Sequence, residues 1–164
     1  MQFFFKKNPE LENKVNLYFK RIEEVNKAKY NNEISIILLG SLSRGEGSWY
    51  KEENTTILLS DIEYFTVIPN GFEKIVLLEK DLDSIANEVF GDNTRFFHVD
   101  NTFVKMGNLK KLEKKLLTFD ANYYGRTVVG KDYIPLIPKV TIKNINYHDI
   151  FDILIHRAFS VLFY

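Results

Sequence analysis

The pattern of hydrophobic and polar positions changes period along the chain. After Asn8-Pro9, which is typical of a helix start, the apolar residues from Leu17 to Val25 recur at helical spacing. Residues 34–39 then form an apolar run, interrupted only by Ser35, which is typical of a buried strand. The pattern therefore predicts a helix that ends near Ala28, followed by a strand that is covered on both faces.

The rest of the chain predicts further elements in alternation. They are a strand over Ile57–Ile68, a helix over Asp81–Phe90, a strand over Arg95–Lys105, an amphipathic helix over Leu109–Leu117, a strand over Gly125–Val129 and an apolar helix over Tyr147–Tyr164. The stretch 48–56 is polar, and we expect irregular structure there. The order predicts an α/β (α+β) fold, with a small mixed central sheet flanked by helices and a C-terminal helix.

The size of the chain predicts one domain over residues 1–164. Its 164 residues are 45% hydrophobic, which is enough to build a core. Because the last apolar pattern runs to Tyr164, we expect 143–164 to begin a C-terminal helical region. The helix over 147–164 either docks against such a region or the sheet, or makes a homodimer contact.

Composition excludes several classes of function. The 22 basic and 22 acidic residues give a net charge of zero, so we expect no long nucleic acid as partner. The lack of cysteine excludes disulfides, thiolate zinc sites and thiol nucleophiles. No apolar run approaches the roughly 20 residues of a membrane span, so we expect no membrane partner and a cytoplasmic protein.

A small-residue turn, Gly40-Ser41-Leu42-Ser43-Arg44-Gly45, follows the first predicted strand. Its backbone N–H groups and the Ser41 hydroxyl can cradle phosphate oxygens, and Arg44 can add a charge-assisted contact. The alternative is an ordinary strand-to-helix turn with an N-capping Ser41. For Arg44, the alternative to a phosphate contact is a salt bridge to Glu46 or another acid that steadies the turn.

Paired carboxylates follow in Ser60-Asp61-Ile62-Glu63. Residues i and i+2 of a strand share a face, so Asp61 and Glu63 would repel each other unless a cation such as Mg²⁺ lies between them. The alternative is an edge strand with two surface acids. Asp100, on the third predicted strand, can join them if its strand is a neighbour, and His98 on the same face either touches substrate, orients Asp100 or is a surface residue.

This combination of turn and acids resembles the nucleotidyltransferase fold of the DNA-polymerase-beta superfamily, over about 34–105 and weakly over 124–132. Ser60-Asp61-Ile62-Glu63 is also similar to the metal-binding segment of aminoglycoside nucleotidyltransferases. One feature departs from the compact members, because Asp61 lies twenty positions after Ser41. The longer spacing, with Trp49–Thr56 as an insertion, looks like that of nucleotidyltransferase-like proteins encoded near bacterial surface-polysaccharide genes.

The resemblance implies two-metal phosphoryl chemistry. Asp61, Glu63 and Asp100 would be catalytic and would ligate two Mg²⁺ ions, and Gly40, Ser41, Arg44 and Ser60 would bind the nucleotide. The protein would move an NMP, with ATP or another NTP as donor, onto a hydroxyl of a small molecule, sugar or protein. The alternative is a non-catalytic nucleotide-binding or antitoxin-like interaction module with the same fold.

Overall fold

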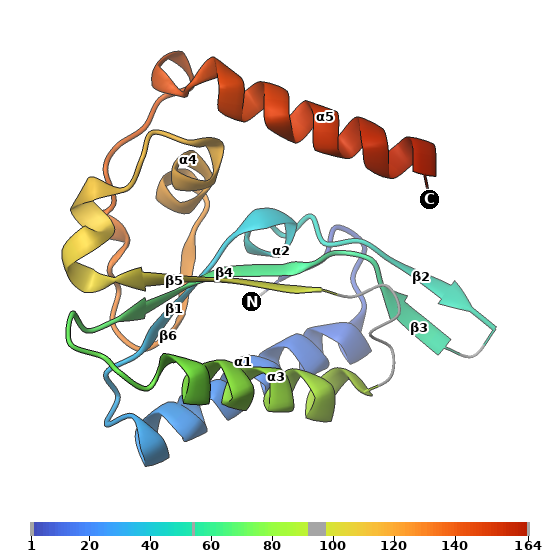
Figure 1. Ribbon diagram of the computed structural model, residues 1–164. Coiled ribbons are helices and arrows are strands. Elements are labelled where there is room, and N and C mark those ends of the chain that lie inside the picture. The colour runs from blue at the N-terminus through green and yellow to red at the C-terminus, as the bar shows by residue number, and fades with distance from the viewer. Residues whose placement is uncertain (1, 54, 92–97, 164) are drawn as a thin grey trace.

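A four-stranded mixed sheet with helices on both faces forms the centre of the protein, as the computed structural model shows for residues 2–53, 55–91 and 98–163 (Figure 1). The strand order is β5-β4-β1-β6, with β1 at Ser35–Leu38, β4 at Ile62–Ile68, β5 at Val99–Lys105 and β6 at Arg126–Val129. Strands β4 and β5 are parallel, whereas β1 is antiparallel to both β4 and β6. The predicted α/β class with a small mixed sheet is therefore confirmed.

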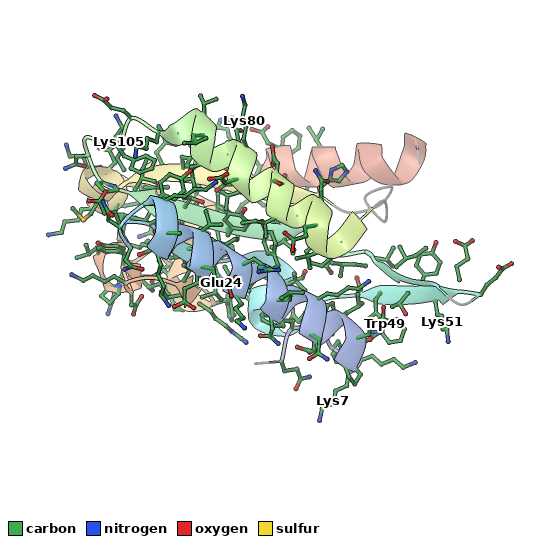
Figure 2. All side chains as sticks on the ribbon, turned by 90° about the horizontal axis from the view of Figure 1, so that it is seen from below. Lys7, Glu24, Trp49, Lys51, Lys80 and Lys105 are labelled. Carbon is green, nitrogen blue, oxygen red and sulfur yellow. The ribbon has the colours of Figure 1, made fainter. Side chains whose placement is uncertain are left out.

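Two helices cover one face of the sheet, α1 (Pro9–Lys29) and α3 (Ile75–Phe90). Helix α1 starts where the sequence predicts, because the Asn8 side chain accepts a hydrogen bond from the Leu11 amide at 3.2 Å. The two helices lie side by side with charged residues such as Glu24 and Lys80 on their outer surface (Figure 2). Their inner surface and this face of the sheet share one core, which includes Val15, Tyr18, Ile22, Leu78, Leu82, Ile36, Leu38, Ile62 and Tyr64.

Shorter elements cover part of the opposite face. They are the 3-10 helices η2 (Met106–Lys111), η3 (Ile134–Leu136) and η4 (Ile142–Asn144), and the helix α4 (Leu116–Tyr123). A second core lies here, formed by Ile37, Leu39, Phe65, Val67, Val104, Leu109, Ala121 and Ile137. Helix α5 (Tyr147–Phe163) follows, and its Asp149 carboxylate accepts a hydrogen bond from the Leu116 amide at the start of α4, at 2.6 Å. Among the described residues, no helix combines the length and the apolar character needed to cross a membrane.

A β-hairpin takes the place of the irregular stretch predicted over 48–56. It consists of β2 (Trp49–Glu52) and β3 (Thr55–Leu58), paired antiparallel. The predicted single strand over Ile57–Ile68 is also wrong, because the chain leaves the hairpin at Leu58 and enters the central sheet only at Ile62. The break is held by Ser60, whose amide and hydroxyl both bond to Ser48.

The predicted helix over Leu109–Leu117 is wrong as well. The chain forms η2, becomes extended at Leu112 and starts α4 only at Leu116. One amphipathic helix would have placed its apolar residues along a single stripe, but Leu109 is fully buried in the second core, on the face of the sheet opposite α1 and α3. The break lets Leu109 and Ala121 enter the same core from two separate elements.

The other predicted elements are present, with some boundaries shifted. Helix α3 begins at Ile75 instead of Asp81, because Leu78 extends the buried stripe by one turn, and it ends before Gly91 as predicted. Strand β5 begins at Val99, and residues 95–97 of the predicted strand lie outside the described residues. The last helix begins at Tyr147 as predicted.

Candidate metal centre

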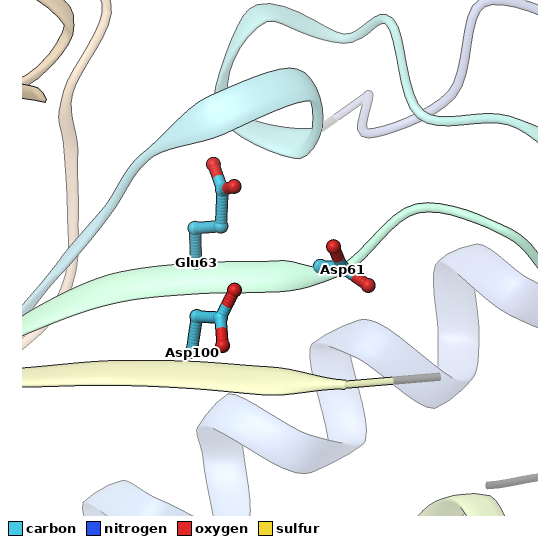
Figure 3. Close-up of side chains that lie close together, drawn as sticks. All are labelled: Asp61, Glu63 and Asp100. Carbon is cyan, nitrogen blue, oxygen red and sulfur yellow. The ribbon is translucent and has the colours of Figure 1, made fainter. Parts of the chain in front are cut away.

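Three carboxylates meet at one end of β4 and β5. Asp61 directly precedes β4, Glu63 is its second residue, and Asp100 lies opposite Glu63 in the parallel register with β5. One oxygen of each carboxylate lies within 4.8 Å of an oxygen of the other two. Figure 3 shows the three side chains gathered below the loop that carries α2 (Gly40–Arg44).

The parallel pairing of β4 and β5 is what brings Asp100 to this cluster. The sequence predicts that Asp61 and Glu63 share a face, and it makes Asp100 a partner only if the two strands are neighbours. The structure confirms that they are. Asp61 and Glu63 are half-buried and Asp100 is exposed, so the cluster is open to solvent on the β5 side. His98 is exposed, and it is not one of the acid cluster.

The donor set fits a hard divalent cation. Carboxylate oxygens are the ligands that Mg²⁺ takes from proteins, and Mg²⁺ is commonly held by one or two carboxylates together with substrate phosphates. Three carboxylates at this separation repel one another, and a bound cation relieves that repulsion. A cysteine-free, histidine-free ligand set does not favour zinc.

The glycine turn packs directly against the acid cluster. Gly40 has a φ of +66°, in the left-handed region, and a Cβ at this position would overlap with the Glu63 carboxylate. The Leu39 amide also donates to the Glu63 carbonyl at 2.8 Å. Glycine is therefore required here for two reasons, the backbone conformation and the close approach of Glu63.

The turn continues as the five-residue helix α2, and the alternative in which Ser41 caps a helix is wrong. The N-cap residue is Leu39, and no side chain makes a capping hydrogen bond there. Ser41 is half-buried in the first turn, and the Ser43 hydroxyl donates to the Gly40 carbonyl at 2.8 Å. Gly45, with a φ of +76°, ends the helix.

Arg44 pairs with acids in the structure, which was one of its two predicted roles. Its Nε donates to Glu46 at 2.7 Å, one Nη donates to Asp120, and its guanidinium lies 5.8 Å from the centre of the Tyr124 ring. Burial lowers the pKa of Arg44, but the Glu46 and Asp120 carboxylates outweigh it, so the pKa of this guanidinium is raised.

Asp120 is the residue that sequence reasoning missed. Its second carboxylate oxygen accepts a hydrogen bond from the Gly40 amide at 2.7 Å, across 80 positions of sequence. The one signal in the sequence is that Asp120 is the only acid between Glu113 and Lys131. The predicted helix over 109–117 also ended before it.

Ser60 lies beside the cluster but its hydroxyl is engaged elsewhere. It accepts a hydrogen bond from the Ser48 amide at 2.8 Å and lies 3.3 Å from the Ser48 hydroxyl. These contacts fix the base of the hairpin next to Asp61. Its predicted role in nucleotide binding stays a prediction.

A cavity of about 320 Å³ borders the acids on the side of α4. Glu63 and Asp100 line it together with Leu39, Tyr64, Asn101, Thr102 and Leu117. Its size is at the lower end of small-molecule sites. The cavity gives a small ligand direct access to two of the three carboxylates.

Comparisons with known proteins give no family for this chain. No model of a protein family matches it, and no curated protein matches it in sequence.

Proposed function

We propose that this protein is a nucleotidyltransferase that moves an NMP, with ATP as the expected donor, onto a hydroxyl group of an acceptor. The observation that carries the proposal is the convergence of Asp61, Glu63 and Asp100 below the Gly40 turn. The resemblance in sequence concerns the order of the turn and the acids along the chain. Their close packing is an independent reason to treat them as one site.

Each residue then has a role that its position supports. Asp61 and Glu63 would hold two Mg²⁺ ions and Asp100 would hold one of them, which would neutralise the phosphates and orient the α-phosphate. Asp100, exposed at the edge of the cavity, would take the proton of the acceptor hydroxyl. The acceptor oxygen would form a bond to the α-phosphorus. The bond between the α-phosphorus and the oxygen that bridges to the β-phosphate would break, and pyrophosphate would leave with that electron pair.

The nucleotide would lie along the turn and the cavity. We propose that Ser41, Arg44 and Ser60 contribute to its binding, with Gly40 allowing close approach. Nucleoside triphosphates and Mg²⁺ are abundant in the cytoplasm, which is the compartment we expect for the protein.

A second candidate function is a nucleotide-binding or antitoxin-like interaction module without catalysis. One observation favours it: Asp120 occupies the Gly40 amide and one side of Arg44, two of the donors predicted to meet phosphate. In that case the acids would hold a cation and nucleotide without transfer.

The first experiment is thermal unfolding with Mg²⁺ and ATP. At 100 times the dissociation constant, binding adds about 2.7 kcal/mol to the free energy of unfolding, or roughly 5–10 °C in Tm for a chain of this length. Asp61→Asn should abolish this shift, whereas the exposed acid substitution Asp83→Asn should keep it.

A transfer assay separates the two candidates. α-labelled ATP is added to a lysate with wild-type protein or Asp61→Asn, and labelled products are compared. Label that appears only with wild type supports transfer, while ATP-dependent stabilisation without any labelled product supports the binding module. If none of the four common NTPs with Mg²⁺ raises the Tm, both candidates are wrong.

A further inference from the structure

We infer that Asp120 is a positioning residue for the acid cluster, acting through α2. One oxygen of its carboxylate accepts from the Gly40 amide at 2.7 Å, and the other accepts from Arg44. Gly40 and Arg44 are the first and the last residue of α2, so a single carboxylate holds both ends of this helix. The inference rests on the proposed function, because it concerns how that site is held.

Asp120 is itself held firmly in place by α4 and β6. Its neighbours Thr118 and Ala121 are buried, and its carbonyl accepts from the amides of Tyr124 and Gly125 where α4 ends. The next residue, Arg126, already pairs with Leu38 of β1. The carboxylate is thus presented from an element anchored in the central sheet, and its side chain is only 15% exposed.

The contact reaches the metal ligands through Gly40. The Glu63 carboxylate lies against Gly40 so closely that no Cβ would fit, so a movement of the turn changes the space in which Glu63 sits. Asp120 fixes the turn by a charge-assisted hydrogen bond to the Gly40 amide. Partners that hydrogen-bond a metal ligand directly change metal affinity by about 10–100-fold when they are removed, and Asp120 acts on Glu63 through the packing of Gly40.

Charge explains why Asp120 supports the cluster without joining it. It is not among the carboxylates that meet within 4.8 Å, and Arg44 lies between it and Glu46. The guanidinium neutralises the carboxylate that faces α2. Asp120 can therefore hold the turn with little added repulsion on the three acids.

The test is the affinity of the protein for Mn²⁺ alone, measured by electron paramagnetic resonance well below the Tm. In Asp120→Asn, the amide group turns an NH₂ toward either the Gly40 N–H or Arg44, so one of the two contacts is lost. We expect Mn²⁺ to bind at least about tenfold more weakly. The control is Asp132→Asn, since the Asp132 carboxylate also accepts two hydrogen bonds, from Thr127 and from the Ile134 amide, but is not one of the acid cluster. It should bind Mn²⁺ as wild type does.

A second measurement needs no variant. In isotopically labelled wild-type protein, nuclear magnetic resonance should detect a coupling across the hydrogen bond between the Gly40 amide nitrogen and the Asp120 carboxyl carbon. If folded Asp120→Asn binds Mn²⁺ as tightly as wild type, the inference is wrong and the proposed function is unaffected. The same holds if wild-type protein binds Mn²⁺ but shows no coupling between Gly40 and Asp120. If wild type itself binds no Mn²⁺, the proposed function fails and the inference fails with it.

Discussion

The substitution Gly40→Ala separates the stability of the protein from the geometry of its acid cluster. Gly40 has a φ of +66°, and alanine in the left-handed region costs about 1–2 kcal/mol. For a chain of this length, that lowers the Tm by roughly 2–8 °C. The protein should therefore fold at room temperature.

The effect on the acids should be much larger than this loss suggests. Ordinary contacts of a Cβ begin at 3.4 Å, whereas the new methyl group would overlap with the Glu63 carboxylate. The carboxylate must move by more than about 1 Å, and functional sites tolerate about 0.5 Å. Since Glu63 is the flexible partner, it swings away from Asp61 and Asp100, and we expect Mn²⁺ affinity to fall at least about tenfold.

Gly45→Ala is the matched control. Gly45 has a φ of +76° at the other end of α2, so alanine there has a similar backbone cost. A Cβ at Gly45 would meet only the Gln2 carbonyl oxygen, at 3.4 Å, which is an ordinary contact. The Tm should fall by a similar amount in both variants. Only Gly40→Ala should bind Mn²⁺ more weakly, in a titration performed about 20 °C below the lower of the two Tm values. Equal Mn²⁺ affinity in the two variants would show that the contact between Gly40 and Glu63 does not control the site.

Two further predictions concern the core. The hydroxyls of Tyr18 and Tyr64 are hydrogen-bonded to each other at 2.8 Å, and burial above all raises the pKa of both, so the folded state keeps these protons longer than the unfolded state. Their contribution to the free energy of unfolding should be constant through neutral pH and fall above about pH 10, by up to about 1.4 kcal/mol per pH unit for each tyrosine. Urea titrations of the Tyr18→Phe/Tyr64→Phe double variant should therefore show a smaller loss of stability at alkaline pH than wild type. An equal loss in both proteins would contradict this role of the two tyrosines. Asn26→Ala removes the side chain that bonds both the amide and the carbonyl of Ile34, at 3.2 and 2.8 Å. This variant should lose roughly 2–5 kcal/mol of unfolding free energy in urea denaturation. The control Asn16→Ala, on the exposed side of α1, should lose less than about 1 kcal/mol. Similar losses for the two variants would contradict a stabilising role of the buried Asn26 hydrogen bonds.

The features of the candidate site that depend on residues close in sequence could be predicted. The spacing of Asp61 and Glu63 is enough to place them on one face of an extended chain, and the glycine after the apolar run predicts a turn at Gly40. Both features follow from the period of the strand and from the missing Cβ of glycine.

The sequence pattern gave wrong predictions where the same residues are compatible with two local structures. The polar stretch 48–56 carries no clear period, yet it pairs with itself as a hairpin, because Trp49–Glu52 and Thr55–Leu58 satisfy each other's backbone groups. The apolar residues over 109–117 fit one helix, but the burial of Leu109 in the second core favours two short elements. In each case, long-range packing decided between local alternatives.

The sequence by itself determined the first and last helices, the buried first strand, the mixed class of the fold and the shared face of Asp61 and Glu63, because these depend on contacts within a few residues. Only the tertiary structure decided that Asp100 lies opposite Glu63, since that requires the parallel pairing of two strands separated by a helix. It also decided that Asp120 reaches Gly40 from 80 positions away. No local period encodes such contacts, because they arise only when the sheet order and the docking of α4 fix separate segments in one place.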